Sequence, residues 1–427
     1  MSKEIVLSLD IGTVNLKTLA ITINGEKLWF SREDISKVKS PRKLWLKILS
    51  EISKIPSSIR SNIKVIVITA HGPSYVVKIH GKKEIIEPYY KPLDKVSTKP
   101  LLNFHEMKLL SAIRSHGVEK IVWITGLKEY IAYKFTNIMT YSKLELRRNV
   151  LEKYVEALES KIFMKENTYK NPIGYVNEAL SKRLGFVGKV SVIIAPTDAI
   201  CSLMGAGCVS VGCSNLDLGY TVTLSSILSN DSKEKHNILS YLFGKELSLK
   251  IDSVIIGHAI SFAKRAFRTH SHYLSSSNLP LMIPMIRKGM FYKTTISAIN
   301  IPYNFSYEKA LKTIIITALL YLRLNSKDIK LSEIRLSGGL ASRDVAELVS
   351  NIFNTKVHVL EDAESSVLGA SFLGISYLSG KELSTISKRI VRIKETYAPI
   401  ERDARKYRRY LKMFEKIYDV LSQLFLD

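Results

Sequence analysis

The sequence predicts a two-domain α/β protein, and an internal duplication is the main observation behind this prediction. The segment LDIGT at residues 9–13 recurs as LDLGYT at residues 216–221, just past the middle of the chain. Each copy ends one apolar run at an Asp-x-Gly turn and begins another, which is the pattern of a β-turn-β unit. A chain of 427 residues also exceeds what one hydrophobic core usually organises. We therefore expect two domains, residues 1–212 and 213–427.

Helical and strand periodicities alternate after each copy, which favours the α/β class. In the first half we expect strands at 5–9, 16–23, 27–31, 63–69 and 190–194. We expect helices there at 44–52, 127–136 and 150–160, and a further helix that begins at a capping box at Asn103 and ends at about Gly117. In the second half we expect strands within 215–227 and at 333–336 and 357–359, and helices at 254–268, 307–325, 343–353, 364–378 and 401–424.

The repeated Asp-x-Gly turns carry a chemical implication. Glycine at the corner of a tight turn lets backbone N–H groups approach an anion, and the neighbouring aspartate can hold a cation. The sequence therefore predicts two facing phosphate loops, at Gly12 and Gly219, with a nucleotide between the two domains.

Composition narrows the functional classes. Lys and Arg number 63 against 39 Asp and Glu, a formal net charge of +24, which raises nonspecific affinity for nucleic acid or attracts anionic substrates. The basic residues are spread along the chain, and their densest cluster, 402–409, lies on an expected helix. A solvated basic helix face explains that cluster without a binding patch, so we expect no specific nucleic-acid partner.

The chain shows no membrane or secretory signal, and we expect a cytoplasmic protein. Its longest apolar runs, such as 314–322, are about half the length needed to cross a bilayer, and Glu4 and Asp10 interrupt the N-terminal apolar stretch. Gln423 is the single glutamine; avoidance of thermolabile amides is typical of heat-adapted proteins, so a thermophilic source is a hypothesis that thermal unfolding tests.

The cysteines are three in number and crowded together, at Cys201, Cys208 and Cys213. Their spacing fits neither a disulfide framework nor paired zinc ligands. We interpret them as small buried hydrophobic residues; an iron–sulfur cluster shared between two copies of the chain is the alternative, which the spacing does not support.

Three segments in order give the sequence a family resemblance. Residues 10–17 (DIGTVNLK), 217–221 (DLGYT) and 337–342 (SGGLAS) together resemble the ATPase core shared by actin, hexokinase and Hsp70-type proteins. Within that superfamily, PTD at 196–198 followed by SLMGAG at 202–207, and ESSVLGA at 364–370, are similar to segments of FGGY-type carbohydrate kinases, with pentulose kinases the nearest group. The resemblance implies two ribonuclease-H-like domains with the active site in the cleft between them.

The resemblance also implies residue roles for phosphoryl transfer from ATP. Asp198 would be the catalytic base that accepts the proton of the substrate hydroxyl. Asp10 would hold Mg²⁺, through water in most such sites. The nucleotide would be bound by Thr13 and Lys17 in the first loop, Gly219 and Thr221 in the second, and Gly338 and Gly339 near the α-phosphate and adenosine. Asp198 as a helix N-cap is the alternative interpretation.

The substrate side is less similar to the family. His71, in the turn AHGPS at 70–74, is the best candidate for substrate contact, since pentulose kinases carry a similar turn; a surface-loop histidine is the alternative. Asp94 and Tyr141 are further candidates for hydroxyl contacts. The chain also departs from the family pattern at Thr197, where a glycine pair is common, and at Tyr220, which separates Gly219 from Thr221.

We therefore expect an ATP- and Mg²⁺-dependent kinase of a small sugar or polyol, with a ketopentose such as xylulose or ribulose as the first candidate substrate. Glycerol or another polyol is the second. A nucleotide-dependent switch that has lost sugar-kinase activity is the rival from another class, and retention of Asp198 argues against it. Binding to nucleic acid rests on net charge alone. The sequence leaves the oligomeric state open, with a homodimer among the options.

Overall fold

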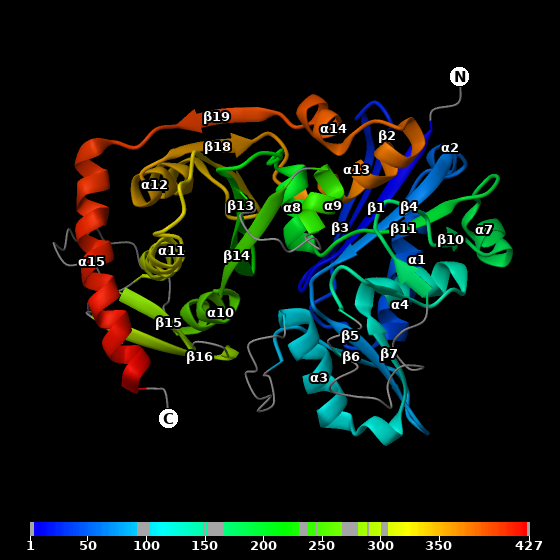
Figure 1. Cartoon of the computed structure of the whole chain (residues 1–427), viewed down its shortest axis with the longest axis horizontal. Helices are drawn as coiled ribbons and strands as arrows, with labels where there is room; N and C mark the ends of the chain where they lie inside the picture. Colours follow the sequence, from blue (N-terminus) through cyan, green and yellow to red (C-terminus); the bar gives the residue numbers. More distant parts are fainter. Residues whose placement is uncertain are drawn as a thin grey trace. The chain divides into compact units, whose positions relative to one another are not determined.

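The computed structural model describes residues 4–91, 103–147, 151, 165–229, 238–244, 246–266, 281–287, 290–299 and 306–424. Its residues form two compact units that do not follow a single cut in the chain. Unit 1 comprises residues 1–209, 230–248 and 364–391, and unit 2 comprises 210–229, 249–363 and 392–427. Helices and strands carry the labels of Figure 1.

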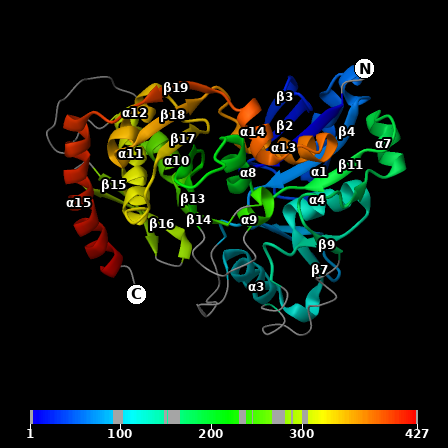
Figure 2. The ribbon, with the colours of Figure 1, turned by 45° about the horizontal axis from the view of Figure 1, so that its top comes forward.

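Unit 1 is built on a six-stranded sheet in the order β10-β11-β4-β1-β2-β3. Its strands are β1 (Ile5–Ile11), β2 (Asn15–Thr22), β3 (Lys27–Asp34), β4 (Ile63–Ala70), β10 (Gly174–Tyr175) and β11 (Ser191–Ile194). β1 pairs antiparallel with β2 and parallel with β4, and β4 pairs parallel with β11. Figures 1 and 2 show α13 (Ser365–Ser379) on one side of this sheet, and α1 (Pro41–Lys54) and α4 (Leu127–Thr136) on the other.

The remaining elements of unit 1 are a second, smaller sheet and several short helices and strands. A three-stranded sheet in the order β6-β5-β7 carries α3. These and the smaller elements are β5 (Tyr75–Ile79), β6 (Ile85–Glu87), β7 (Ile121–Gly126), α2 (Ser57–Arg60), α3 (Phe104–His116), η1 (Val118–Lys120), β8 (Thr140–Ser142), β9 (Lys165–Asn167), α7 (Glu178–Leu184), α8 (Asp198–Gly205), α9 (Ile238–Phe243) and α14 (Leu383–Ile390).

Unit 2 repeats the sheet of unit 1. Its strand order is β14-β13-β12-β17-β18-β19, from β12 (Cys213–Leu218), β13 (Thr221–Ser229), β14 (Leu247–Ile255), β17 (Glu333–Ser337), β18 (Lys356–Leu360) and β19 (Ile393–Tyr397). β12 pairs antiparallel with β13 and parallel with β17, as β1 does with β2 and β4. The predicted duplication is therefore confirmed in three dimensions, with the two Asp-x-Gly turns at equivalent strand ends.

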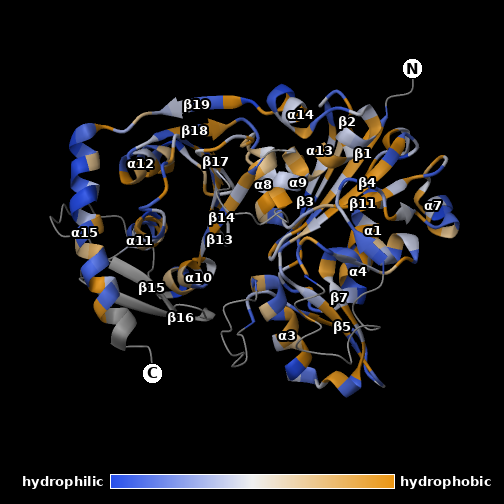
Figure 3. Ribbon diagram, in the orientation of Figure 1, coloured by the Kyte–Doolittle hydropathy of each residue, from blue (hydrophilic) through white to orange (hydrophobic). Residues whose placement is uncertain are grey.

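Helices cover the sheet of unit 2. They are α10 (Gly257–Ala266), α11 (Tyr307–Asn325), α12 (Arg343–Phe353) and α15 (Glu401–Leu424), and a hairpin of β15 (Leu281–Arg287) and β16 (Met290–Ile299) accompanies them. α15 is largely hydrophilic in Figure 3 but places Phe414, 1% exposed, in the core with Leu216 and Ile314. Among the described helices we find none with the length and hydropathy of a membrane span.

The cysteines differ in part from the expectation. Cys208 and Cys213 are disulfide-bonded, and Cys201 is the free cysteine. All three are buried, as expected, but the interpretation of all three as unpaired hydrophobic residues is wrong. Gly207 and Gly212 have φ of 79° and 84°, a left-handed conformation that glycine adopts without strain. These residues turn the chain back between α8 and β12, so that two cysteines five positions apart meet, which spacing alone did not reveal.

Candidate functional site

The first predicted phosphate loop is the turn between β1 and β2. Asp10, at the end of β1, is 1% exposed. Its Oδ2 atom accepts a hydrogen bond from Ser366 Oγ at 2.5 Å and lies 3.2 Å from Lys17 Nζ. Its Oδ1 atom is buried and has no hydrogen-bond partner among the described residues. A buried carboxylate oxygen without a partner is costly unless a ligand compensates it, and a hard oxygen donor of this kind suits Mg²⁺.

Lys17 lies within a small ionic network behind this turn. Its Nζ atom is 2.9 Å from Glu364 Oε2 as well as 3.2 Å from Asp10, and Glu364 also pairs with Arg32 at 3.0 Å. Glu364 is the N-cap residue of α13, so α13 contributes both Glu364 and Ser366 to the loop. A phosphate group that binds Lys17 would therefore compete with these carboxylates for its charge.

Asp198 begins helix α8, directly after the N-cap residue Thr197. Its Oδ1 atom accepts a hydrogen bond from the backbone N–H of Ala199 at 2.9 Å. The N-cap alternative is thus partly realised, because the carboxylate does satisfy a helix-terminal N–H group, although the cap position itself belongs to Thr197. Asp198 is half-buried rather than enclosed, so its carboxylate is able to contact a ligand.

The turn that carries His71 packs directly against this segment. A Cβ atom on Gly72 would overlap the methyl group of Thr197, so glycine is needed for the close approach. The side chain of Thr69 reinforces the contact by donating a hydrogen bond to the carbonyl oxygen of Pro196 at 2.6 Å. His71, predicted to contact the substrate, and Asp198, predicted to accept its proton, therefore belong to two packed segments of unit 1.

His71 is not the surface-loop histidine of the alternative interpretation, because it is only 9% exposed. Its Nδ1 atom and its backbone N–H both contact the carbonyl oxygen of Ile11, at 2.9 and 2.8 Å. A carbonyl oxygen accepts only, so the ring proton is assigned to Nδ1, and Nε2 is left as an acceptor for a substrate hydroxyl. Burial lowers the pKa of His71 to about 4, with the Asp10 carboxylate opposing it.

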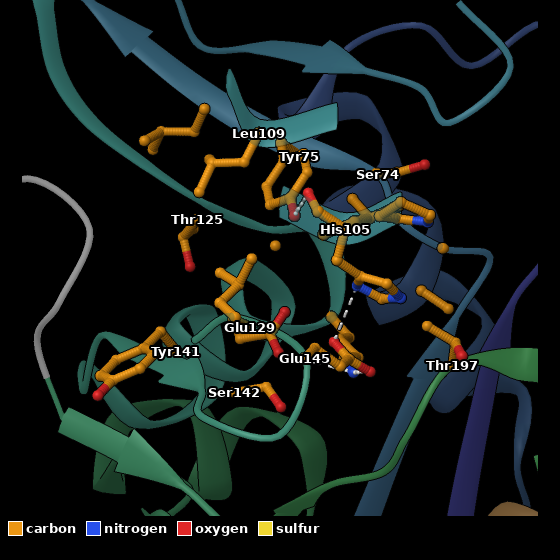
Figure 4. A pocket seen from close by; sticks show the side chains of 18 of the residues that line it. Ser74, Tyr75, His105, Leu109, Thr125, Glu129, Tyr141, Ser142, Glu145 and Thr197 are labelled. Atoms are coloured by element: carbon orange, nitrogen blue, oxygen red, sulfur yellow. Dashed lines mark hydrogen bonds and ion pairs between the residues drawn. The ribbon is translucent and has the colours of Figure 1, made fainter. Parts of the chain in front are cut away.

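His71 and Tyr141 line the same cavity in unit 1. Figure 4 shows Tyr75, His105 and Glu145 near one another in this cavity, with Tyr141 and Thr197 on opposite sides of the view. The hydroxyl of Tyr141 donates to Glu166 Oε1 at 3.1 Å. The cavity volume of about 30 Å³ is room for about one or two water molecules, so a sugar would enter only if lining side chains moved. Asp94 lies outside the described residues.

Buried charges form one wall of this cavity. Lys128 Nζ lies 2.6 Å from Glu145 Oε1 and 3.7 Å from Glu129 Oε1. Burial raises the pKa of Glu129 to about 7, with Lys128 opposing. Burial also acts to raise the pKa of Glu145, but Lys128 and His105 outweigh it and lower that pKa. The wall therefore offers carboxylate acceptors for hydroxyl groups, and its lysine is already paired.

The second predicted phosphate loop, in unit 2, lies against the turn that carries the two glycines expected near the α-phosphate and adenosine. Gly338 has φ of 92°, and a Cβ atom on it would overlap Asp217 and Leu218 of the loop. The backbone N–H of Leu340 donates to the carbonyl oxygen of Leu218 at 3.2 Å. The turn that carries Gly338 and Gly339 thus packs on the loop that carries Gly219 and Thr221.

Tyr220 points away from that loop toward helix α10. Its ring packs so closely on Gly257 that a Cβ atom there would overlap it, and its hydroxyl contacts the imidazole of His258 at 3.0 Å. The backbone N–H groups of Ile256 and Gly257 both donate to its carbonyl oxygen. The tyrosine inserted into the loop is therefore accommodated by glycine at the start of α10.

Sequence reasoning missed residues that reach the site from distant segments. Ser366 was noted only within a family-like segment, and Tyr89 only within a segment that departs from the family. Tyr89 contacts both Thr13 and His71. No local pattern marks either contact, since the partners of Ser366 and Tyr89 lie 356 and 76 positions away.

The pKa of His71 gives a prediction for acid stability. Its folded pKa of about 4 lies below the usual histidine value of 6.5, so between these values the unfolded chain binds a proton that the folded chain does not. This residue therefore costs the fold up to about 3 kcal/mol as the pH falls from 7 to 4. His71→Gln should reduce the loss of stability over that interval by a similar amount, measured by urea unfolding at both pH values. An equal loss in the two proteins would contradict the buried neutral imidazole.

Comparison with known proteins agrees with this architecture. No protein-family model matches the chain. A curated relative, a xylulose kinase from Staphylococcus epidermidis, is 20% identical over 100% of this chain and 99% of its own. The solved gluconate kinase of Lactobacillus acidophilus superposes with a TM-score of 0.79 at 17% identity, covering 99% of both chains. The xylulose kinase of the same organism gives 0.78 at 17%, covering 98% of both.

A more distant structure points the same way. The glycerol kinase of Plasmodium falciparum, solved with ADP, gives a TM-score of 0.68 at 12% identity and covers 97% of this chain and 98% of its own. The expected two-domain α/β architecture is confirmed by this likeness. With its duplicated sheet and two Asp-x-Gly turns, the chain has the actin-like ATPase fold and is a distant relative of the FGGY-type carbohydrate kinases.

Proposed function

We propose that this protein transfers the γ-phosphoryl group of ATP to a hydroxyl of a small sugar or polyol. The observation that carries the proposal is the placement of Asp198 at the start of α8, packed against the turn that holds His71. In this arrangement a carboxylate base and a hydroxyl-binding imidazole come from adjacent segments of one unit. Asp198 accepts the proton of the attacking hydroxyl, and His71 Nε2 accepts a hydrogen bond from another hydroxyl of the same substrate.

The phosphate loops supply the nucleotide side of the proposed site. Thr13 and Lys17 would hold the terminal phosphates in unit 1, and Gly219, Thr221, Gly338 and Gly339 of unit 2 would line the rest of the nucleotide. Asp10 would hold Mg²⁺, which neutralises phosphate charge when bound. The described residues form no group of three or more metal-ligating His, Cys, Asp or Glu side chains, so the partnerless Asp10 Oδ1 supports an ion held mainly by water and phosphate.

A ketopentose such as xylulose or ribulose is the first candidate acceptor, and glycerol or another polyol is the second. The curated xylulose-kinase relatives and the xylulose-kinase structures support a ketopentose, while the gluconate-kinase structure leaves room for a sugar acid.

The test is ADP production by the purified protein with ATP and Mg²⁺, across ketopentoses, pentitols, glycerol, ketohexoses and aldonates. Heating steps during the same assay also test the hypothesis of a thermophilic source. We expect turnover that requires one class of acceptor. Nucleotide binding with equal, acceptor-independent ADP formation for every compound would contradict kinase activity and favour a nucleotide-dependent switch.

A further inference from the structure

Tyr89 touches both sides of the proposed reaction within unit 1. It follows strand β6, and its backbone N–H donates to Ser74 Oγ at 3.0 Å. Its ring meets the ring of His71 edge to face, with centroids 5.4 Å apart. Its hydroxyl oxygen accepts a hydrogen bond from Thr13 Oγ1 at 3.3 Å. One half-buried side chain therefore joins the wall of the cavity to the first phosphate loop.

The contact with Thr13 has a direct chemical consequence. A threonine hydroxyl has one proton to donate, and in this structure Thr13 donates it to Tyr89. Thr13 is also a residue proposed to bind the terminal phosphates. A phosphate oxygen can only accept, so Thr13 has to stop donating to Tyr89 before it can donate to a phosphate.

The contact with His71 connects the same tyrosine to the substrate side. His71 is fixed by its two contacts with the Ile11 carbonyl, and an aromatic edge-to-face pair contributes a defined, short-range preference for one ring orientation. The cavity beside His71 is too small for a sugar in this structure, so binding there must shift lining side chains. A shift of the His71 ring would change the packing of the Tyr89 ring against it.

We propose that Tyr89 is a positioning residue that latches Thr13 while the acceptor cavity is closed, and releases it when the cavity opens. This inference rests on the proposed function, because it assigns phosphate binding to Thr13 and acceptor binding to His71. The latch lowers affinity for nucleotide in the protein without acceptor and limits wasteful ATP hydrolysis. Because coupling is reciprocal, an occupied phosphate loop also favours acceptor binding.

Tyr89→Phe tests the latch, because it keeps the ring on His71 and removes the hydroxyl that holds Thr13. Calorimetric titration with the β,γ-imido analogue of ATP and Mg²⁺, without acceptor, should show about five-fold tighter binding than in the unmodified protein, the size expected for one hydrogen bond no longer broken. ATP hydrolysis without acceptor should rise in the same protein.

Tyr90→Phe is the matched control, since Tyr90 is the next residue, 39% exposed, and should bind the analogue as the unmodified protein does. Unchanged or weaker binding by Tyr89→Phe would overturn the latch. If that variant does not fold, Tyr89→Leu, which removes the hydroxyl and the ring contact together, is titrated instead with the same expected gain.

A double-mutant cycle with His71→Gln tests the connection to the cavity. If His71 acts through Tyr89, His71→Gln should change analogue affinity in the unmodified protein but not in Tyr89→Phe protein; additive effects would overturn the coupling. The titrations use no acceptor and measure no phosphoryl transfer, so their outcome can be told apart from a failure of the proposed function. Absence of transfer to every acceptor would reject the kinase while these affinities still decide the latch.

Discussion

Asp198→Asn should lower the rate of acceptor-dependent ADP formation by about a thousand-fold, because an amide has no lone pair basic enough to accept the substrate proton. The amide oxygen can still accept the hydrogen bond from Ala199 N–H that Asp198 Oδ1 accepts now, so the start of α8 should persist. Affinity for the ATP analogue should change less than two-fold. Steady-state kinetics and calorimetric titration measure the two effects on the same preparation.

Asp34→Asn is the control for this substitution. Asp34 ends β3, is exposed and accepts a hydrogen bond from Ser36 N–H. The substitution therefore removes a carboxylate of unit 1 that has no proposed role in binding or catalysis. It should leave turnover unchanged. Wild-type turnover in Asp198→Asn protein would show that another group accepts the proton.

Gly205→Ala should destabilise the protein by at least about 3 kcal/mol, because it places a methyl group between two helix backbones. A Cβ atom on Gly205 of α8 would overlap the carbonyl oxygen of Ser365 in α13, and one on Gly369 would overlap the carbonyl oxygen of Cys201. Neither atom belongs to a flexible side chain that can turn aside. Urea unfolding, or the yield of folded protein if unfolding starts in buffer, measures the loss.

Gly185→Ala provides the comparison. Gly185 has φ of 71° and no atom within 4 Å of an added Cβ, so alanine there pays only the left-handed backbone penalty of about 1 kcal/mol. A similar loss for both substitutions would contradict the close crossing of α8 and α13. The crossing matters for the site, because α8 begins with Asp198 and α13 presents Ser366 to Asp10.

Features set by neighbouring residues were predictable from the sequence. The capping box at Asn103 and Glu106 is present, with both hydrogen bonds at 2.9 Å, and the helix at 127–136 has the expected bounds. Both depend on interactions within a few positions. The helix expected at 254–268 was partly wrong: Val254 and Ile255 end strand β14, and α10 begins at Gly257. A short apolar run fits both the helix and the strand periodicity, so only its pairing within the sheet determines that it is a strand.

Contacts between distant segments were not predictable. The two Asp-x-Gly turns were predictable as a structural repeat because the duplication marked them twice, and their binding of phosphate stays a prediction. Ser366 and Glu364 gain their places only when α13 packs against β1, and Tyr89 only when the segment after β6 reaches Thr13. A serine, glutamate or tyrosine carries no local signal of such a partner. The buried wall of Lys128, Glu129 and Glu145 was missed for the same reason. The expected roles of Asp198, His71 and the loop residues, and the expectations of a homodimer and a cytoplasmic location, stay predictions.

The place of α13 in unit 1 has a consequence during synthesis of the chain. Gly374 of this helix packs against the side chains of Val6 and Val67 on β1 and β4, yet residues 364–391 follow most of unit 2 in the chain. At translation rates of about 5–20 residues per second, roughly 20–80 seconds pass between the first strand and this helix. The apolar face of the first sheet has no permanent cover during that time. Unit 1 can therefore complete its fold only after residues 364–391 have been made. A chain whose synthesis stops before residue 364 leaves the first sheet uncovered and is prone to aggregate.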